Sequence, residues 1–203
     1  MQKISVDGKL ITPSKIVCIG RNYVEHIAEL GNEIPDDMVV FTKPNSAISH
    51  TLRAMKDEPL HYEGEICFVY EGGTFSAVGF GLDLTKRKLQ SRLKEKGLPW
   101  ERAKAFDGAA VFSDFKSIKD INCNYEVQLK INDALIQKGD VSLMMYSPAA
   151  ILQELTLFMT LEDGDIVMTG TPKGVGVIEG ADNFVGSILY QNKVLLSATW
   201  IAQ

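Results

Sequence analysis

The sequence predicts an α+β protein that is predominantly β. Short runs rich in β-branched and aromatic residues, separated by turn residues, recur along most of the chain. Two pairs of these runs are joined by short polar turns, as the strands of β-hairpins are. Segments with helical periodicity are few, and they are bounded by capping residues. These three observations favour a fold of β-sheets with a few flanking helices.

The strand-like runs follow one another from the N-terminal to the C-terminal end. The clearest hairpin starts at Tyr125, keeps Val127 and Leu129 on one face, and turns near Asn132 and Asp133. A second hairpin is expected to turn at Asn192-Lys193. The predicted strands are residues 15–19, 39–42, 65–70, 77–83, 125–131, 165–169, 186–190 and 194–199.

Two helices are predicted from their end signals. One begins after Thr85 and ends at Gly97, because glycine readily adopts the left-handed conformation that closes a helix. The other begins at Ser147, a capping residue, with Pro148 in the first helical position. Its predicted buried face consists of Ile151, Leu152, Leu155 and Phe158.

Composition limits the classes of protein to which this chain can belong. With 203 residues and 45% hydrophobic content, we expect one compact domain over residues 1–203. The net charge is −5, and lysines and arginines are scattered, which argues against nucleic-acid binding. The three cysteines form no C-x-x-C pair, so a disulfide framework is not expected and a reducing cytoplasm fits best. No segment approaches the ~20 apolar residues of a membrane span.

Three carboxylates are candidates for a metal site. Glu63 and Glu65 are two residues apart at the head of a strand, so their side chains project from the same face. Asp83 ends the next strand, in which small residues on one face leave room beside the carboxylate for an ion. The same spacing is also common on solvated strand faces, but the apolar neighbours here predict burial on both sides. Ligands that are all oxygen favour Mg²⁺ or Mn²⁺.

A short helix carries a candidate acid–base pair. Asn22 can cap this helix, with Glu25 as the partner in a capping box, and Gly31 is expected to end it. His26 and Glu29 are three residues apart and so lie on one face, where the carboxylate can orient the imidazole. Such a pair is more often an ordinary polar contact, but the glycine-led turn at residues 20–23, which precedes the helix, favours a catalytic site here.

Two further features are ambiguous by themselves. Lys104 lies among small and apolar residues, where it is either a buried cation with an anionic partner or a surface lysine with a buried stem. The glycine-rich loop 170–176 lacks the order of a nucleotide-binding loop. It either presents the Thr171 hydroxyl and backbone N–H groups to a small anion or forms a plain turn.

In combination, these motifs resemble the fumarylacetoacetate hydrolase family, and most closely its short members that act on acylpyruvates and oxaloacetate. The motifs occur in the family's order and span residues 16 to 177. One departure is Gly64, which stands where the family often has an apolar residue and predicts a looser glutamate strand. The matching motifs are residues 17–23 with His26 and Glu29, 41–44, Glu63-x-Glu65, 82–85 with Arg87 and Gln90, Lys104-x-Phe106-Asp107-Gly108, and 164–176.

The resemblance implies a mixed β-sandwich or β-roll, usually as a homodimer, with Mg²⁺ or Mn²⁺ bound by Glu63, Glu65 and Asp83. By the same matching, His26 and Glu29 activate water, with Lys104 as a further catalytic residue. The positions implied to bind substrate are Arg21, Arg87, Gln90 and Thr171.

The implied activity is hydrolysis of acylpyruvates, such as fumarylpyruvate or acetylpyruvate, to pyruvate and a carboxylic acid. Decarboxylation of oxaloacetate is a second expected activity, since it uses the same stabilised enolate without an attacking water. The alternatives are an isomerase or decarboxylase of aromatic breakdown products, or a catalytically silent binding protein with the same fold.

Overall fold

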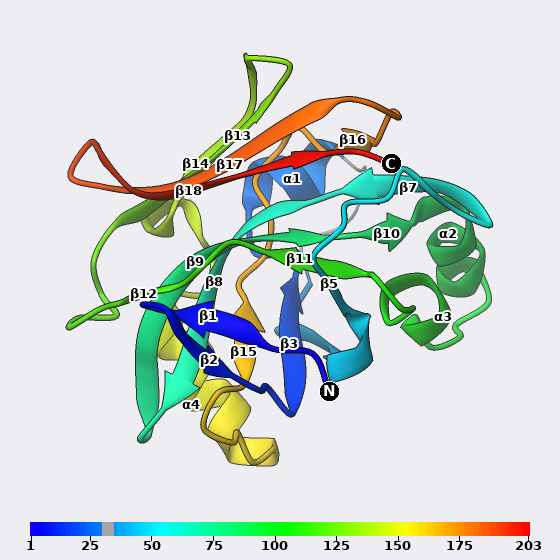
Figure 1. Cartoon of the computed structure of the whole chain (residues 1–203). Coiled ribbons are helices and arrows are strands. Elements are labelled where there is room, and N and C mark those ends of the chain that lie inside the picture. The colour runs from blue at the N-terminus through cyan, green and yellow to red at the C-terminus, as the bar shows by residue number, and fades with distance from the viewer. Residues whose placement is uncertain (30–34) are drawn as a thin grey trace.

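A mixed β-sheet of eight strands is the largest element of the computed structural model, which describes residues 1–29 and 35–203 (Figure 1). β3 pairs in parallel with β15, and β11 pairs in parallel with β5, while the other pairings are antiparallel. The strands in spatial order are β4 (Val39–Pro44), β3 (Lys15–Gly20), β15 (Ile166–Met168), β8 (Gly64–Glu71), β9 (Thr74–Asp83), β11 (Ala110–Phe112) and β5 (Ile48–Ser49), with β12 (Lys116–Ser117) on β9.

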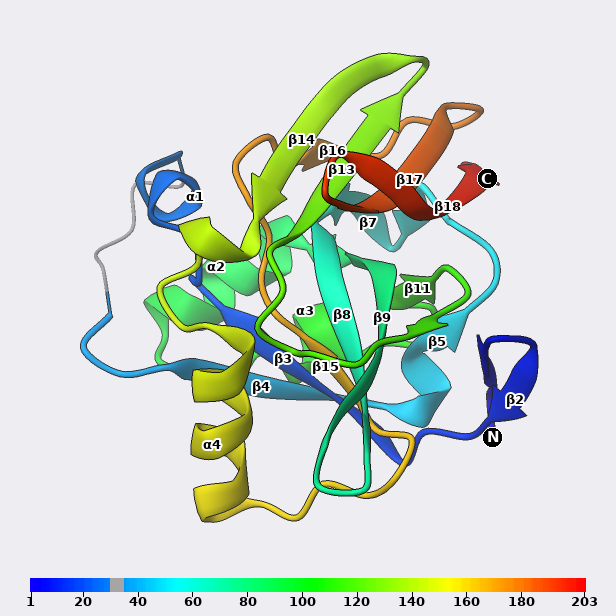
Figure 2. The same cartoon turned by 90° about the vertical axis from the view of Figure 1, so that its left-hand side faces the viewer.

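A second, antiparallel sheet of four strands packs over one face of β8 and β9 (Figure 2). Aromatic side chains join the two layers: the Phe80 and Trp200 rings are 5.9 Å apart, and the Phe68 and Tyr125 rings are 6.1 Å apart. The predicted predominantly β fold with packed sheets is thus confirmed. The strands of this sheet, in spatial order, are β14 (Ala134–Asp140), β13 (Tyr125–Ile131), β17 (Asn183–Tyr190) and β18 (Lys193–Ile201).

Two smaller sheets complete the β structure. One of them lies beside the end of β9 and leads into the helix that begins at Arg87. The other is an N-terminal hairpin. Their strands are β10 (Thr85–Lys86), β7 (Glu58–Tyr62) and β16 (Gly176–Val177), with β6 (Met55–Lys56) on β7, and β1 (Ile4–Val6) with β2 (Lys9–Ile11).

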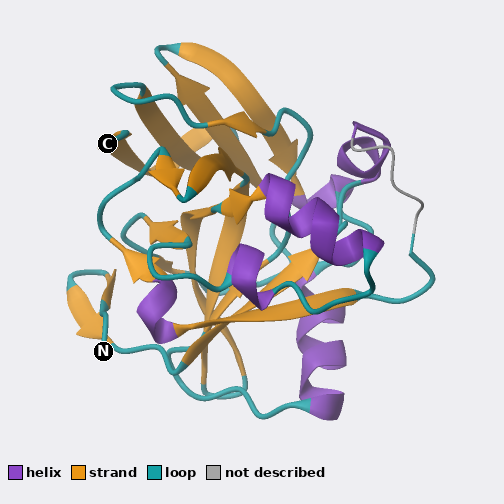
Figure 3. Cartoon of the chain, turned by 90° about the vertical axis from the view of Figure 1, so that its right-hand side faces the viewer, coloured by secondary structure: helices purple, strands orange, loops and turns teal. Residues whose placement is uncertain are grey.

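The helices lie outside the sheets (Figure 3). None of those in the described ranges is long and apolar enough to cross a membrane. Short 3₁₀ turns occur at Asn45–Ala47 and Val141–Leu143. The α-helices are α1 (Val24–Glu29), α2 (Arg87–Glu95), α3 (Glu101–Lys104) and α4 (Pro148–Phe158).

Helix ends confirm part of the prediction and correct part of it. Ser147 caps α4 by accepting a hydrogen bond of 3.3 Å from the Ala150 N–H. Gly97, just beyond α2, has the expected positive φ of 61°. The predicted burial of Phe158 is wrong: this residue is 58% exposed because the last turn of α4 extends past the sheet (Figure 2).

The short helix begins later than Asn22, which does not act as the expected cap. Asn22 is buried, and its amide donates to the Thr169 carbonyl (2.8 Å) while its side-chain oxygen accepts from the Tyr146 N–H (2.7 Å). It therefore joins three separate segments. The predicted end of the helix at Gly31 lies outside the described residues.

Both hairpin turns use residues with positive φ. Asn132 and Asp133 have φ values of 49° and 67°, as the sequence predicts for a tight turn between β13 and β14. The turn between β17 and β18 is at Gln191 and Asn192, with φ values of 51° and 61°, one residue earlier than predicted.

The core lies on both faces of the central sheet. Ile66 and Phe68 of β8 belong to the larger cluster, between the sheets, while Cys67 and Val69 belong to a smaller cluster on the opposite face. The predicted burial of this strand on both sides is therefore confirmed. Because side chains alternate along a strand, Glu65 shares the face of Cys67.

Candidate active site

The predicted carboxylate cluster forms at the point where β8 begins and β9 ends. Glu63, Glu65 and Asp83 are 7%, 3% and 1% exposed, and each offers an oxygen within 4.8 Å of the others'. Antiparallel pairing of Glu65 with Gly81 brings Asp83 beside the two glutamates. We call these three residues the carboxylate cluster.

Lys104 is a buried cation with anionic partners. Its ammonium group lies 2.8 Å from Glu63 Oε2, 2.8 Å from Asp83 Oδ2 and 2.6 Å from Thr85 Oγ1. Burial by itself would lower the pKa of Lys104, but the carboxylates of Asp83 and Glu63 outweigh this effect and raise it. Lys104 therefore remains charged and ties the ends of β8 and β9 together.

Two more cations complete the pairing of Glu63 and Asp83. Lys43, fully buried on β4, lies 2.7 Å from Asp83 Oδ1 and also donates to the Lys104 carbonyl. Arg87, at the start of α2, donates to Glu63 Oε1. Burial would raise the pKa of Glu63, but Lys104 and Arg87 outweigh it and lower this pKa.

Glu65 differs from its two neighbours in the partners of its carboxylate. Within the described residues, that carboxylate has one hydrogen bond, of 2.7 Å from the Gly170 N–H, and no ion pair. Burial, and then the charges of Asp83 and Glu63, raise the pKa of Glu65 well above its usual range. A divalent cation among the three carboxylates would supply the missing positive charge. The all-oxygen donor set therefore fits Mg²⁺ or Mn²⁺.

The small residues of β9 do not leave room for an ion beside Asp83, contrary to the sequence-based prediction. A Cβ atom at Gly81 would lie 2.5 Å from Cys67 Sγ, and one at Gly79 would lie 2.6 Å from the Phe115 ring. The small residues of β9 therefore make space for a sulfur atom and aromatic rings, and not for an ion.

Gly64 does not loosen the strand, contrary to the sequence-based expectation. Its N–H donates to Gln137 Oε1 at 2.9 Å, and the Gln137 amide donates to Thr171 Oγ1 at 2.9 Å. A Cβ at Gly64 would lie 3.0 Å from Gln137 Oε1. Gly64 thus lets Gln137 of β14 approach and fix the strand.

His26 and Glu29 of α1 form the expected pair, with His26 Nδ1 and Glu29 Oε2 3.2 Å apart. The imidazole is 6% exposed and lines the same pocket as the carboxylate cluster. Glu29 also accepts a hydrogen bond of 2.9 Å from the Gly174 N–H, so the loop after β15 holds the carboxylate that contacts His26.

The residues expected to bind substrate also line this pocket. Arg87 Nη1 donates to Gln90 Oε1 at 2.9 Å, which fixes both side chains on the first turn of α2. The Thr171 hydroxyl lies 2.9 Å from the Gly64 carbonyl, its nearest acceptor. The hydroxyl therefore donates its hydrogen bond to the protein backbone. Arg21 lies on the turn before α1, with a φ of 56°.

Sequence reasoning did not identify several residues of the pocket as functional. Lys43 belongs to one of the matching motifs, but no local sequence pattern indicates that it reaches Asp83. Phe41, Trp100 and Lys94 form one wall, in which the Phe41 and Trp100 rings are 6.0 Å apart. The clustering of aromatic and basic residues in 94–104 was the only available signal.

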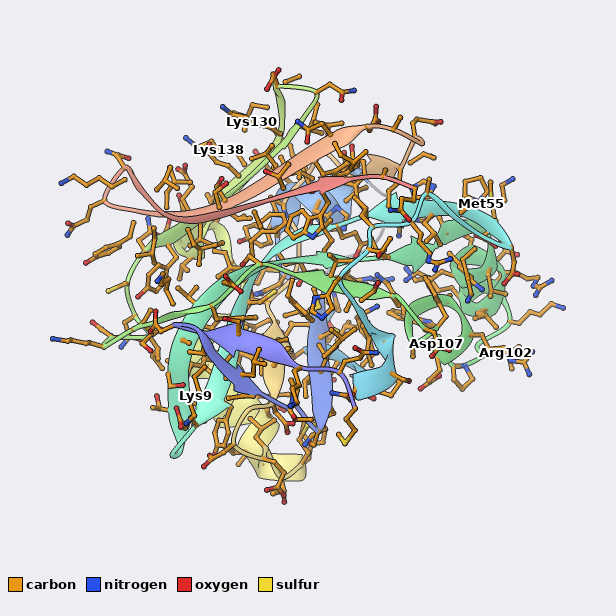
Figure 4. The ribbon with its side chains drawn as sticks, in the orientation of Figure 1. Lys9, Met55, Arg102, Asp107, Lys130 and Lys138 are labelled. Carbon is orange, nitrogen blue, oxygen red and sulfur yellow. The ribbon has the colours of Figure 1, made fainter. Side chains whose placement is uncertain are left out.

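Other charged side chains lie away from this pocket. Figure 4 shows Lys130 and Lys138 on the β13–β14 hairpin and Lys9 on the N-terminal hairpin, while Arg102 and Asp107 point outward near α3. Asp107 belongs to the same sequence motif as Lys104 but is exposed. Within that motif, therefore, Lys104 faces the pocket and Asp107 faces the outside.

The sequence matches the fumarylacetoacetate (FAA) hydrolase C-terminal family over residues 15–198. The chain belongs to the fumarylacetoacetate hydrolase family. This match contains the whole carboxylate cluster, His26, Glu29 and Lys104. The resemblance inferred from the ordered motifs is confirmed.

Two curated relatives in this family are named for a reaction of oxaloacetate. The mitochondrial oxaloacetate tautomerase FAHD1 of Bos taurus is 37% identical over 191 residues, covering 85% of this chain and 86% of that protein. The oxaloacetate tautomerase YcgM of Escherichia coli (strain K12) is 33% identical over 188 residues, covering 83% and 85%. Tautomerisation was not among the reactions predicted from the sequence.

A solved structure in the same family contains both a metal and a 2-oxo acid. Fumarylpyruvate hydrolase from Pseudomonas aeruginosa, in complex with Mn²⁺ and pyruvate, is 27% identical with a TM-score of 0.87. The match covers 99% of this chain and 95% of that one. Together with the buried carboxylate cluster, this likeness supports the predicted Mg²⁺ or Mn²⁺ cofactor.

Proposed function

We propose that this chain is a divalent-metal-dependent enzyme that acts on the enol forms of 2-oxo acids. The observation that carries the proposal is the buried carboxylate cluster, in which Lys104 pairs with Glu63 and Asp83 while the Glu65 carboxylate has no cationic partner among the described residues. The names of the curated relatives favour tautomerisation of oxaloacetate as the main reaction. Hydrolysis of acylpyruvates is the second candidate, and the His26–Glu29 pair favours it.

Glu63, Glu65 and Asp83 would hold the cation in this proposal. When bound, Mg²⁺ or Mn²⁺ supplies positive charge that stabilises negative charge developing on the 2-oxo group of the substrate. Lys104 pairs with Glu63 and Asp83 and orients both carboxylates, so the cation would meet a preformed site.

Arg87 supplies a donor for the substrate carboxylate. Its two terminal nitrogens donate to Glu63 and Gln90, while its Nε is buried and has no hydrogen-bond partner among the described residues. The Nε has no open surface, but the Arg87 side chain is 17% exposed and lines the pocket, so an anion bound there would gain a charge-assisted hydrogen bond from its terminal nitrogens. The substrate carboxylate would therefore lie at the first turn of α2.

For hydrolysis, the water must be activated from the opposite wall of the pocket. His26 would take a proton from water as the oxygen attacks the acyl carbonyl, and Glu29 would orient the imidazole and stabilise its charged form. The C–C bond then breaks, and protonation of the departing enolate gives pyruvate beside the carboxylic acid. Tautomerisation of oxaloacetate only moves a proton between carbon and oxygen and needs no attacking water.

The proposal is tested with protein that has been stripped of metal and then given Mg²⁺, Mn²⁺ or no metal. Loss of enol-oxaloacetate absorbance measures tautomerisation, and pyruvate release from acetylpyruvate and fumarylpyruvate measures hydrolysis. Metal-dependent acceleration of either reaction supports the proposal. Pyruvate release from oxaloacetate alone would indicate a decarboxylase, and no acceleration of any reaction by the metal-loaded protein would contradict the proposal.

We also infer a homodimer, as the family resemblance implies, and a cytoplasmic location, which three cysteines without a C-x-x-C pair favour. Exposed apolar side chains on α4 support an interface there: Leu157 is 75% exposed and Phe158 is 58% exposed. Multi-angle light scattering should give twice the chain mass, and Leu157→Asp should give the mass of one chain. A monomeric wild-type protein would contradict this inference.

A further inference from the structure

Lys94 lies in the candidate pocket, away from the carboxylate cluster. It is the eighth residue of α2, and the turn at Gly97 brings Trp100 back under it, so that the Lys94 ammonium lies 4.8 Å from the centre of the indole ring. Phe41 packs against Trp100, and the Lys104 ammonium lies 5.3 Å from the centre of the Phe41 ring. Two aromatic rings thus separate Lys94 from Lys104 along one wall.

Lys94 has no anionic partner among the described residues. Lys43, Arg87 and Lys104 each contact a member of the carboxylate cluster, whereas no carboxylate of the described chain lies within ion-pair distance of Lys94. Lys43, Arg87 and Lys104 are thus already paired with Glu63 and Asp83, whereas Lys94 is not. The charge on Lys94 is therefore available to a ligand.

The surroundings of Lys94 show the same surplus of positive charge. Burial, and then the charges of Arg21, Arg87 and Lys104, lower the pKa of Lys94 to about 8. The ammonium form still predominates at pH 7, but it is held in a half-buried position among other cations. An anion bound against Trp100 would relieve this repulsion.

We propose that Lys94, positioned by Trp100, is a specificity-determining residue that binds the second carboxylate of a dicarboxylic 2-oxo acid. This inference rests on the proposed function, which places the 2-oxo acid end of the substrate at the carboxylate cluster and Arg87. The aromatic wall then runs along the middle of the substrate, and Lys94 binds the carboxylate at the far end of the substrate. Dicarboxylates are preferred over monocarboxylates of the same length.

A purely structural role for Lys94 makes a different prediction. If the side chain only packs its stem on Trp100, methionine at this position preserves the packing and leaves ligand preference unchanged. If the ammonium binds a carboxylate, methionine removes the preference while the fold stays intact. Lys94→Met therefore separates the two roles, and Lys94→Gln serves as a second variant with a polar end.

The test uses two unreactive probes that differ in a single carboxylate, 2-oxoglutarate and 2-oxopentanoate. Calorimetry on the full-length Mn²⁺-loaded protein measures both dissociation constants. We expect the wild-type protein to prefer 2-oxoglutarate by about tenfold, the usual effect of one charge-assisted hydrogen bond. Lys94→Met and Lys94→Gln should bind both probes equally, and Lys94→Arg should restore the preference. The matched control is Lys96→Met on the exposed end of the same helix, which should keep it.

Two results would overturn the inference: a wild-type protein without preference, or an unchanged preference in both Lys94→Met and Lys94→Gln. The binding experiment does not depend on turnover. A preference that disappears in Lys94→Met supports the role of Lys94 even if no reaction is accelerated, in which case only the proposed activity fails. Conversely, tautomerase activity with no effect of Lys94 on probe binding supports the activity and contradicts the inference.

Discussion

The carboxylate cluster and helix α1 face the same pocket, but they are held in place very differently. Glu63 and Asp83 lie at the ends of long, paired strands and contact the buried lysines of β4 and α3 and the half-buried Arg87 of α2. The six-residue helix α1 is joined to the loop after β15 by the Glu29–Gly174 hydrogen bond and by the exposed Lys173–Glu25 ion pair. The difference indicates that the metal end of the pocket is preformed, while the His26 end is held by fewer contacts among the described residues.

The same comparison separates the two chemical tasks. Stabilising an enolate requires fixed charges at the substrate's 2-oxo group, which the rigid side supplies. Activating a water requires a base at the acyl carbonyl, which the helix side supplies through His26. Variants on the two sides should therefore have different consequences.

The largest effect is expected from Glu65→Gln. The amide keeps the hydrogen bond from Gly170 but removes a charge that the cation needs, so activity should fall on the order of 10³-fold. Without metal, the variant should melt at a higher temperature than the wild type, because the glutamine removes a buried carboxylate that has no cationic partner among the described residues.

Melting curves with and without Mn²⁺ check this expectation, and Glu71→Gln at the exposed end of the same strand is the control. The wild-type and control proteins should be stabilised by Mn²⁺, and Glu65→Gln should not. Equal stabilisation of all three by Mn²⁺ would show that the cation binds elsewhere.

Lys43→Met should have the largest effect on stability. It removes a fully buried cation from Asp83, and breaking a buried ion pair on one side usually costs about 3–5 kcal/mol. Urea denaturation measures the free energy of unfolding. The control is Lys116→Met, which breaks the exposed ion pair with Asp7 and should change the free energy of unfolding far less than Lys43→Met does. Similar losses in the two variants would contradict the view that the carboxylate side is a rigid, buried charge network.

A smaller effect is expected at Asp165, which joins β15 to β3. Its side chain accepts hydrogen bonds from the Ser14 and Lys15 N–H groups at 3.0 and 3.1 Å, and from the Glu162 N–H at 2.9 Å. Asp165→Asn should therefore lower the free energy of unfolding by about 1–3 kcal/mol. The control is Asp163→Asn, since exposed Asp163 accepts from only the Gly72 N–H among the described residues.

The pH dependence of this loss follows from the pKa of Asp165. Burial would raise it, but the hydrogen bonds from Lys15 and Ser14 outweigh burial and lower the pKa below its ordinary 3.8. Ionised Asp165 therefore stabilises the fold above pH 3.8, and this contribution shrinks as the pH falls further through the folded-state pKa. The wild type and Asp165→Asn should thus become more similar in stability below pH 3.8. A constant difference down to strongly acidic pH would contradict this linkage.

Local patterns were sufficient to predict the carboxylate cluster and the acid–base pair. Glu63 and Glu65 follow the two-residue period of a strand, and Asp83 closes the strand that follows it in sequence. His26 and Glu29 follow from the helical period. The ordered motifs then supplied the family and the packed β-sheets.

The remaining features depend on contacts between distant segments. Lys43 contacts the carbonyl of Lys104, 61 residues away, and no local pattern predicts such a pairing. Phe158 fits the apolar period of α4 but lies beyond the edge of the sheet, because the period gives the face of a helix and not how far the sheet extends. Lys94 resembles a solvated helix residue until the turn at Gly97 brings Trp100 beneath it.

The separation of tasks within the pocket is tested most directly by the ratio of two rates in His26→Ala. Metal-loaded wild-type and variant proteins would be compared for oxaloacetate tautomerisation and for pyruvate release from fumarylpyruvate. We expect hydrolysis to fall by about 10²–10⁴-fold, the usual contribution of a general base, while tautomerisation changes by less than about tenfold. An equal fall in both reactions would contradict the account, because it would make His26 part of the enol chemistry itself.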